Sequence, residues 1–353
     1  MSLISSRYGL AMMESESTYN TDEIDASYTA NAAVVFQDFT DLMITPVAVQ
    51  WHPATLRGSA SQVPHVQIKD QCTVTASGML RGWISGGAGE EAPYYSPLLT
   101  ASTLSETVVA ATSATYAPAT TQQGSVTVYK YERNLEDDNY RLITATGVRL
   151  NTTINFAINQ EATWTATGVG ASFEDYSAPA AFISPTTGQP ALRKDGLSAT
   201  TSTAAYADAD PMVCQSMTIT VGGNTYNCSE VTLDFGYTPT PIQTVNPAQT
   251  TSSVIGLRNQ DSRPSGTFQL LDGGTAYSAA LTDWVASNQL TIDIRIANST
   301  SRIDFTAPYC QIARPEPGDQ AGVRAYAINY FLAGDFASSL AGNNDFALQY
   351  RSP

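Results

Sequence analysis

Histidine and cysteine, which often act as general bases, nucleophiles or metal ligands, are scarce in this chain. Among 353 residues there are only two histidines, His52 and His65, and each lies beside a proline in a predicted loop. Neither belongs to a recognisable catalytic triad. The four cysteines show no C-x-x-C spacing, so a zinc site is not expected. These cysteines are Cys72, Cys214, Cys228 and Cys310.

Cys214 and Cys228 flank a predicted hairpin, a position that suggests a disulfide. A two-residue turn at Gly222-Gly223 would place Cys214 opposite Val231 rather than opposite Cys228. Because this register separates the two thiols, we expect all four cysteines to be free and mostly buried.

Neighbouring carboxylates and glycines form no complete functional motif. Glu136-Asp137-Asp138 is typical of a hairpin tip, and Asp208-x-Asp210 lacks the glycine and distal glutamate of a calcium loop. The Gly-x-Gly pairs lack the third glycine of a nucleotide fingerprint. A carboxylate pair for glycoside hydrolysis stays open, because a distance in space cannot be read from a sequence. We expect no enzymatic activity, no cofactor and no metal.

The charge of the chain is strongly negative, although charged residues are few. With 32 acidic and 17 basic residues the net charge is −15, and only 14% of residues are charged. Such a field repels DNA phosphates, so tight nucleic-acid binding is not expected. No run approaches the ~18 apolar residues of a membrane span, and acidic residues stand where a signal peptide would be apolar. We therefore expect neither membrane insertion nor export by the usual route.

Nearly every ordered segment alternates between apolar and polar residues, which predicts half-buried β-strands. Typical examples are Ile154-Phe156-Ile158, Val231-Leu233-Phe235 and Ile292-Ile294-Ile296. Only two short segments, 93–102 and 277–287, have a helical pattern. The fold class is therefore predicted to be all-β, with the helices flanking the sheets.

The order of these elements indicates an internal duplication. In each half a strand is followed by a long loop, a second strand, a short helix, a third strand and a two-strand hairpin. We predict an N-terminal arm over 1–46, a first unit over 47–171, a linker over 172–211 and a second unit over 212–353. The alternative is that an all-β chain of this length resembles itself by chance.

The segment from Gly82 to Glu132 resembles the major tail tube proteins of long-tailed bacteriophages. The similarity lies in a Gly/Ala-rich segment, a proline before a helix with a Leu pair, a Tyr-x-Pro, and a long hairpin that ends in an aromatic residue and a glycine. Here these are Gly86 to Gly89, Pro93, Leu98-Leu99, Tyr116-x-Pro118 and Trp164 to Gly168. The opening segment, with Tyr19, is also similar. Ala145-Thr146-Gly147 departs from the Gly-Cys or Gly-aromatic pair of many relatives.

The resemblance implies a β-sandwich-like tail-tube unit whose strands join those of neighbours into one closed barrel. Six units make a ring, and rings stack into the tube through which DNA is ejected. Two units per chain would give a homotrimer; a homohexamer of single-unit chains with an insertion is the alternative. The implied partners are other copies of this chain, the tape-measure, terminator and baseplate proteins, and DNA in transit. The implied location is the virion tail, after assembly in the host cytoplasm.

Several residues are candidates for these roles. Alternation on predicted strands selects Asp234, Asp293 and Asp304 to face the lumen, where an acidic wall would not hold DNA. The long loops after the first strand of each unit are the candidates for ring stacking, and the candidate contact residues in them are Arg57, His65, Arg258 and Arg263. A capsid decoration protein or a fibre module is the alternative function, and a carbohydrate-binding module is a third.

Overall fold

The structure is a computed structural model, and it describes only part of the chain in detail. The described residues are 4–24, 35–37, 39–51, 66–82, 92–93, 95–109, 112–119, 124–134, 140–176, 205–206, 211–214, 217–243, 254–260, 264–271, 275–297, 301–320, 322–333 and 345–351. Most of them lie in strands, so the all-β class is confirmed.

In the first half of the chain the structure describes eleven strands and one helix. They are β1 (Ile4–Ser15), β2 (Val35–Gln37), β3 (Phe39–Trp51), β4 (Val66–Met79), α2 (Ser96–Ala101), β5 (Leu104–Val109), β6 (Ser113–Pro118), β7 (Val126–Asn134), β8 (Tyr140–Ala157), β9 (Thr163–Gly170), β10 (Ser172–Tyr176) and β11 (Ala205–Tyr206).

Among the described residues of the second half there are eleven further strands and one helix. They are β12 (Met217–Val221), β13 (Asn224–Tyr226), β14 (Cys228–Asp234), β15 (Thr238–Gln243), β16 (Val254–Gln260), β17 (Ser265–Leu271), α3 (Thr275–Ala286), β18 (Leu290–Ala297), β19 (Arg302–Ile312), β20 (Glu316–Gln320), β21 (Val323–Leu332) and β22 (Ala347–Arg351). Both predicted helices are confirmed.

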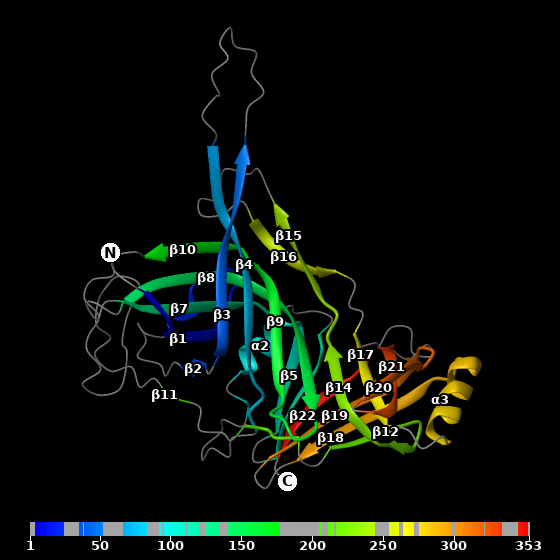
Figure 1. Cartoon of the computed structure of the whole chain (residues 1–353). Coiled ribbons are helices and arrows are strands. Elements are labelled where there is room, and N and C mark those ends of the chain that lie inside the picture. Colours follow the sequence, from blue (N-terminus) through cyan, green and yellow to red (C-terminus); the bar gives the residue numbers. More distant parts are fainter. Residues whose placement is uncertain are drawn as a thin grey trace.

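The strands pair in two similar series (Figure 1). In the first half β3 pairs with β4, β4 with β9, β9 with β8, and β8 with β7. In the second half β14 pairs with β17, β17 with β21, β21 with β19, and β19 with β18. All these pairs are antiparallel. The described sheet does not close into a barrel within one chain.

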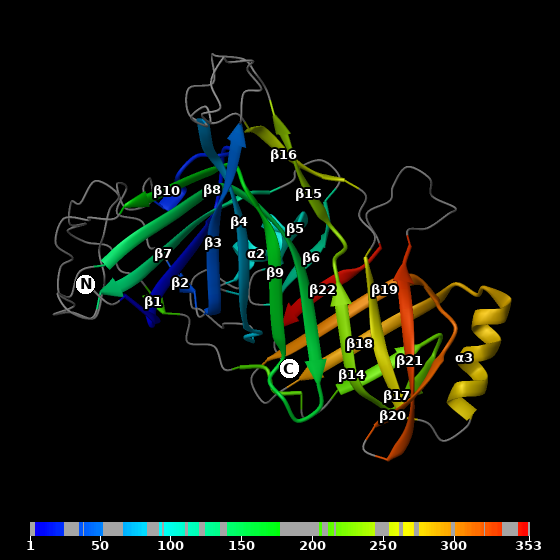
Figure 2. The same ribbon diagram turned by 45° about the horizontal axis from the view of Figure 1, so that its top comes forward.

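Two pairings between described strands join the halves. β8 pairs with β14, from Thr153 opposite Asp234 to Ala157 opposite Glu230. β6 pairs with β22, which also pairs with β19, so the β5–β6 hairpin extends the sheet of the second half (Figure 2). The Tyr350 ring on β22 lies 5.9 Å from that of Tyr95 and 5.8 Å from that of Tyr116. Because one buried apolar cluster includes residues of both halves, the halves share a core.

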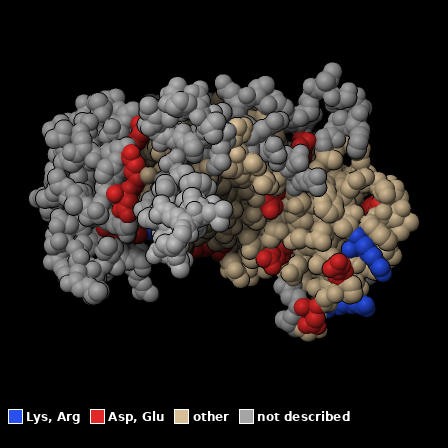
Figure 3. Space-filling view, turned by 90° about the horizontal axis from the view of Figure 1, so that it is seen from above, with Lys and Arg blue, Asp and Glu red and all other residues tan. Residues whose placement is uncertain are grey.

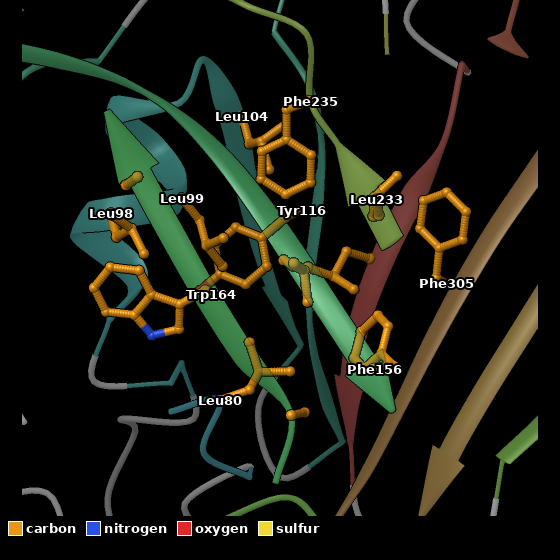
Figure 4. Close-up of a cluster of buried hydrophobic side chains, with 14 of the residues drawn as sticks. Leu80, Leu98, Leu99, Leu104, Tyr116, Phe156, Trp164, Leu233, Phe235 and Phe305 are labelled. Atoms are coloured by element: carbon orange, nitrogen blue, oxygen red, sulfur yellow. The ribbon is translucent and has the colours of Figure 1, made fainter. Parts of the chain in front are cut away.

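The core of the first half forms around α2 (Figure 4). Leu98 and Leu99 of α2 are almost fully buried and point toward Trp164 of β9. The Trp164 indole donates a hydrogen bond to the Met79 carbonyl oxygen at 3.2 Å, which satisfies its only polar atom. The helix is short, but its Leu pair fills the space between the strands.

The N-terminal segment is part of the fold, although the sequence predicted an arm over 1–46. β1 pairs with β7, and Met12 and Met13 are buried. The Glu16 carboxylate then accepts hydrogen bonds from the Gly147 N–H at 2.6 Å and the Ser125 hydroxyl at 2.6 Å. Burial raises the pKa of Glu16, although these hydrogen bonds act to lower it.

Other predicted boundaries fall inside strands. Residue 47 lies within β3, and 172–176 of the predicted linker form β10, which pairs with β8. The predicted strand at 47–51 therefore begins earlier, at Phe39, and the short segment SFEDY of β10 contains too few apolar residues for alternation to identify it. At Gly222 and Gly223 the turn has φ values of 57° and 82°, and Val221 pairs with Asn224, as the hairpin prediction required. All four cysteines are free.

Candidate functional site

The sheet formed by β3, β4, β9, β8, β14, β17 and β21 has one face on which small polar side chains predominate. Directly paired residues lie on the same face of a sheet, so the strand register identifies its members. One row crosses all seven strands: Asp41, Ser77, Thr165, Thr153, Asp234, Ser265 and Phe331.

A second row, shifted along the strands, crosses the same sheet. It consists of Met79, Thr163, Asn155, Thr232, Thr267 and Asn329. On the other side of the first row lie Met43, Thr75, Thr167 and Asn151. We call this surface the hydroxyl face. Its alternate residues, such as Val74, Ile154 and Leu233, are buried in the core.

The three rows of the hydroxyl face carry few charges, and all of them are negative. Asp41 and Asp234 lie in these rows, and none of the side chains in the rows is a lysine or arginine. Just outside the rows, Glu230 lies two residues from Thr232 on the same face of β14, and the buried Arg149 lies two residues from Asn151 on the same face of β8. Seen from above, the molecule shows acidic side chains spread over its described surface, whereas basic ones lie toward one end (Figure 3). The hydroxyl face is therefore neutral or weakly acidic.

Asp234 also stabilises the backbone where β14 ends. Its Oδ1 accepts hydrogen bonds from Asn151 Nδ2 at 2.8 Å and from the Gly236 N–H at 2.8 Å. Asn151 in turn accepts a hydrogen bond from the Tyr237 N–H at 2.9 Å. Gly236 has a φ of 69°, which favours glycine. Asp234 thus has a structural role in addition to its negative charge.

Asp304 has different surroundings, because three arginines surround its carboxylate. Arg295 Nε lies 2.8 Å from Oδ1, while Arg302 and Arg351 approach Oδ2 at 2.9 Å and 2.6 Å. Burial acts to raise the pKa of Asp304, but the hydrogen bonds from Arg302 and Arg295 and the charge of Arg351 together lower it below its ordinary value. The carboxylate is therefore neutralised and contributes no free negative charge.

Asp293 lies beside this arginine cluster. A hollow of about 410 Å³ includes both Asp293 and Asp304 in its lining, with Thr218, Thr220 and Thr306 among its neutral residues. These residues lie on β12, β18 and β19, away from the rows of the hydroxyl face. Asp293 is exposed there.

The structure thus separates the three aspartates that the sequence selected for one surface. Asp293 and Asp304 lie together, whereas Asp234 lies on the hydroxyl face. Sequence reasoning missed Asp41 and Glu230. For Glu230 the signal was present, since it precedes Asp234 by four positions on one alternating strand.

Only one of the four stacking candidates lies among the described residues. Arg57, His65 and Arg263 lie outside the described residues, and Arg258 is described only as a backbone position in β16, opposite Thr240 of β15.

The described part of the chain has no evident metal-binding or activated nucleophilic group. No group of three or more His, Cys, Asp or Glu residues there could hold a metal ion. Burial raises the pKa of Cys72 and Cys310 to about 12, so both remain protonated thiols at neutral pH. Within the described residues no helix has the length and apolar character needed to cross a membrane.

Neither a comparison with protein-family models nor one with curated proteins found a match for this chain.

Proposed function

We propose that this chain is a wall subunit of a bacteriophage tail tube, the conduit through which DNA is ejected. The observation that supports this most strongly is the hydroxyl face. It is a broad surface on which Thr, Ser and Asn side chains predominate, with two carboxylates and no described cation in its three rows.

The chemistry of this face suits transient passage of DNA. A protein holds DNA mainly by placing lysine and arginine on phosphates and releasing counterions. A neutral hydroxyl surface offers hydrogen bonds that water replaces easily, and scattered carboxylates repel phosphates over about one Debye length. DNA beside such a wall is neither bound nor strongly expelled.

The strand pairing supports a chain with two tail-tube units. Corresponding strands are β3 and β14, β4 and β17, β9 and β21, β8 and β19, and β7 and β18. Each helix follows the second strand of its series. β7 and β18, which correspond to each other, also have corresponding outer neighbours, because β1 pairs with β7 and β12 pairs with β18. Agreement at this many strands favours duplication over chance similarity between two all-β halves.

Two units per chain imply a ring of three chains. Three copies supply six units, and closure of the ring removes exposed sheet edges. Rings would stack into a tube in the virion tail, where the tape-measure, terminator and baseplate proteins are the partners that the tail-tube resemblance implies. Asp234, Asp41 and Glu230 would then face the lumen, whereas the Asp304 cluster would lie away from it.

Electron microscopy of the concentrated, purified chain tests this function. We expect rings and stacked tubes with an open lumen, and native mass spectrometry should give three chains per ring. A chain that stays monomeric at every concentration, or that binds capsids without forming tubes, would instead favour a decoration or fibre protein.

A further inference from the structure

Two edge strands of the described sheet, β3 and β20, each have one side without a partner strand. In the other half of the chain, the strands that correspond to them pair with each other. Among the described strands, β3 pairs only with β4, and β20 pairs only with β21. Their counterparts, β14 and the last part of β8, pair with each other where the halves meet. We propose that β20 of one copy pairs antiparallel with β3 of a second copy, with Gly318 opposite Met43. This inference rests on the proposed function and names the surface through which copies meet.

The register follows from matching the two halves. β7 and β8 begin their pairing at Val126 opposite Val148, and β18 and β19 begin at Leu290 opposite Cys310. Val148 therefore corresponds to Cys310. Both strands then pair with the last strand of their own half, β9 or β21.

From this starting point the correspondence extends across each sheet. Leu150 pairs with Gly168, and Ile312 pairs with Tyr330. In the first half, Gly168 pairs on its other side with Val74, and Val74 pairs with Ile44. In the second half, Tyr330 pairs on its other side with Gly266, and Gly266 pairs with Leu233. Ile44 therefore corresponds to Leu233, and Met43 corresponds to Thr232.

The other open edge, β20, is aligned with the last part of β8 in the same way. Trp164 of β9 pairs with Ile154, and its counterpart Tyr326 of β21 pairs with Pro317. Ile154 therefore corresponds to Pro317, and Asn155 corresponds to Gly318. Inside the chain Thr232 lies opposite Asn155. The equivalent pair between two copies is Met43 opposite Gly318, within a ladder of 41–45 against 316–320.

The side chains at this pair suit an interface. Met43 is 55% exposed although it is apolar. A Cβ atom at Gly318 would meet only the Ala325 carbonyl oxygen, at 3.7 Å, so the space beside β20 is open. Both positions belong to the hydroxyl side of the sheet, because their partners are Thr75 and Ala325.

Prolines limit the length of this ladder. Where the halves meet, the Phe235 N–H donates to the Thr152 carbonyl oxygen at 3.1 Å. Pro46 occupies the position that corresponds to Phe235 and has no N–H to donate, and Pro317 on β20 also lacks one. Proline on an open edge prevents uncontrolled strand addition. The contact between copies is therefore shorter than the contact between halves, and a ring should separate into whole chains first.

Cysteine cross-linking of the full-length chain tests the register. The double variant Met43→Cys/Gly318→Cys should, after mild oxidation, give linked species of two and three chains on a non-reducing gel. The matched control is Thr232→Cys/Asn155→Cys, which places the same pair inside one chain and should link without joining copies. Each single variant should give no closed three-chain species. Thr45→Cys/Glu316→Cys occupies the same register two residues away and serves if the first variant folds poorly.

Microscopy of the same samples separates the possible failures. Rings that form while both inter-copy pairs stay unlinked, with the in-chain control linked, would overturn the proposed pairing and leave the tail-tube function intact. Absence of rings in the wild-type chain would overturn the function and the pairing together. Linked species longer than three chains would contradict a three-chain ring.

Discussion

The two helices occupy corresponding places in the two halves but are covered very differently. In α2, Leu98, Leu99 and Ala101 are buried, whereas in α3 only Ala280 is fully buried among the described side chains. Trp284 is 38% exposed and Val285 is 71% exposed. Figure 1 shows α2 behind β4 and β9 and α3 at the edge of the molecule.

The difference lies in what surrounds each helix rather than in the sheet order. α2 contacts β1, β5, β7 and β8, whereas the main described contact of α3 is with β19. The β5–β6 hairpin that follows α2 has no counterpart after α3, where β18 begins almost at once. One strand order therefore supports either a helix in the core or a helix on the surface.

Truncation of the two helices should give the largest difference between the halves. Leu99→Ala should lower the free energy of unfolding by about 2–5 kcal/mol, because it leaves a cavity in a closed core. Val285→Ala should change it by less than about 0.5 kcal/mol, because the side chain is mostly in water. Urea denaturation measures both. Similar losses would show that α3 is covered in solution.

Both halves place a glycine beneath a large aromatic side chain, and this similarity can also be tested. A Cβ at Gly78 would lie 2.6 Å from the Trp164 ring, whereas one at Gly266 would collide with the Thr232 carbonyl oxygen and with Tyr330. Alanine at either site should cost about 1–3 kcal/mol of stability.

The loss of stability should be greater at Gly266, because backbone atoms move aside less easily than a side chain does. The Tyr330 hydroxyl also donates to the Thr232 carbonyl oxygen at 2.8 Å, and a methyl group at Gly266 would disturb that bond. Thermal unfolding of Gly78→Ala and Gly266→Ala compares them directly. A smaller loss for Gly266→Ala would mean that β17 and β14 can separate without strain.

Asp234 and its counterpart Thr45 provide a third comparison. Asp234→Ala removes two hydrogen bonds to a carboxylate and should cost about 1.5–3 kcal/mol. The exposed side chain of Thr45 has no such role, so Thr45→Ala should stay within about 0.5 kcal/mol. Equal effects in chemical denaturation would contradict the structural role of Asp234.

Local structure was predictable from the sequence because alternation reports burial directly. Ile292, Ile294 and Ile296 are all buried, as their spacing required, and the Gly222-Gly223 turn formed as predicted. The same signal could not identify which strands pair. Nothing in CSEVTLD indicates that β14 lies between β8 and β17, since the paired residues are 73 to 81 positions apart for β8 and 31 to 42 positions apart for β17.

The candidate site was only partly predictable for the same reason. Alternation placed Asp234 correctly on a polar strand face, but it could not show that Arg295, Arg302 and Arg351 meet at Asp304. Arg351 is 47 positions from Asp304 and reaches it only because β22 pairs with β19. The sequence gives the sign of a side-chain charge but does not show which residues surround it in the fold. Those surrounding residues determine whether the charge is neutralised or exposed to solvent.

The arginine cluster of the second half should have a small, pH-dependent effect. Asp304→Asn keeps the shape of the side chain but removes its charge, and should cost about 1–2 kcal/mol at pH 7 because three guanidinium groups lose their anion. Since the pKa of Asp304 is lowered below 3.8 in the folded chain, its contribution is complete above that ordinary value. It is lost as the pH falls through the lower, folded value.

The stability difference between wild type and Asp304→Asn should therefore be constant from pH 7 to about 5 and shrink toward pH 3. Urea denaturation over this range measures it. Glu16, whose pKa is raised, favours the folded state as the pH falls, but it is present in both proteins and cancels from the difference. A difference that persists unchanged at pH 3 would show that Asp304 acts through hydrogen-bond geometry alone, and that its negative charge is not what holds the three arginines together.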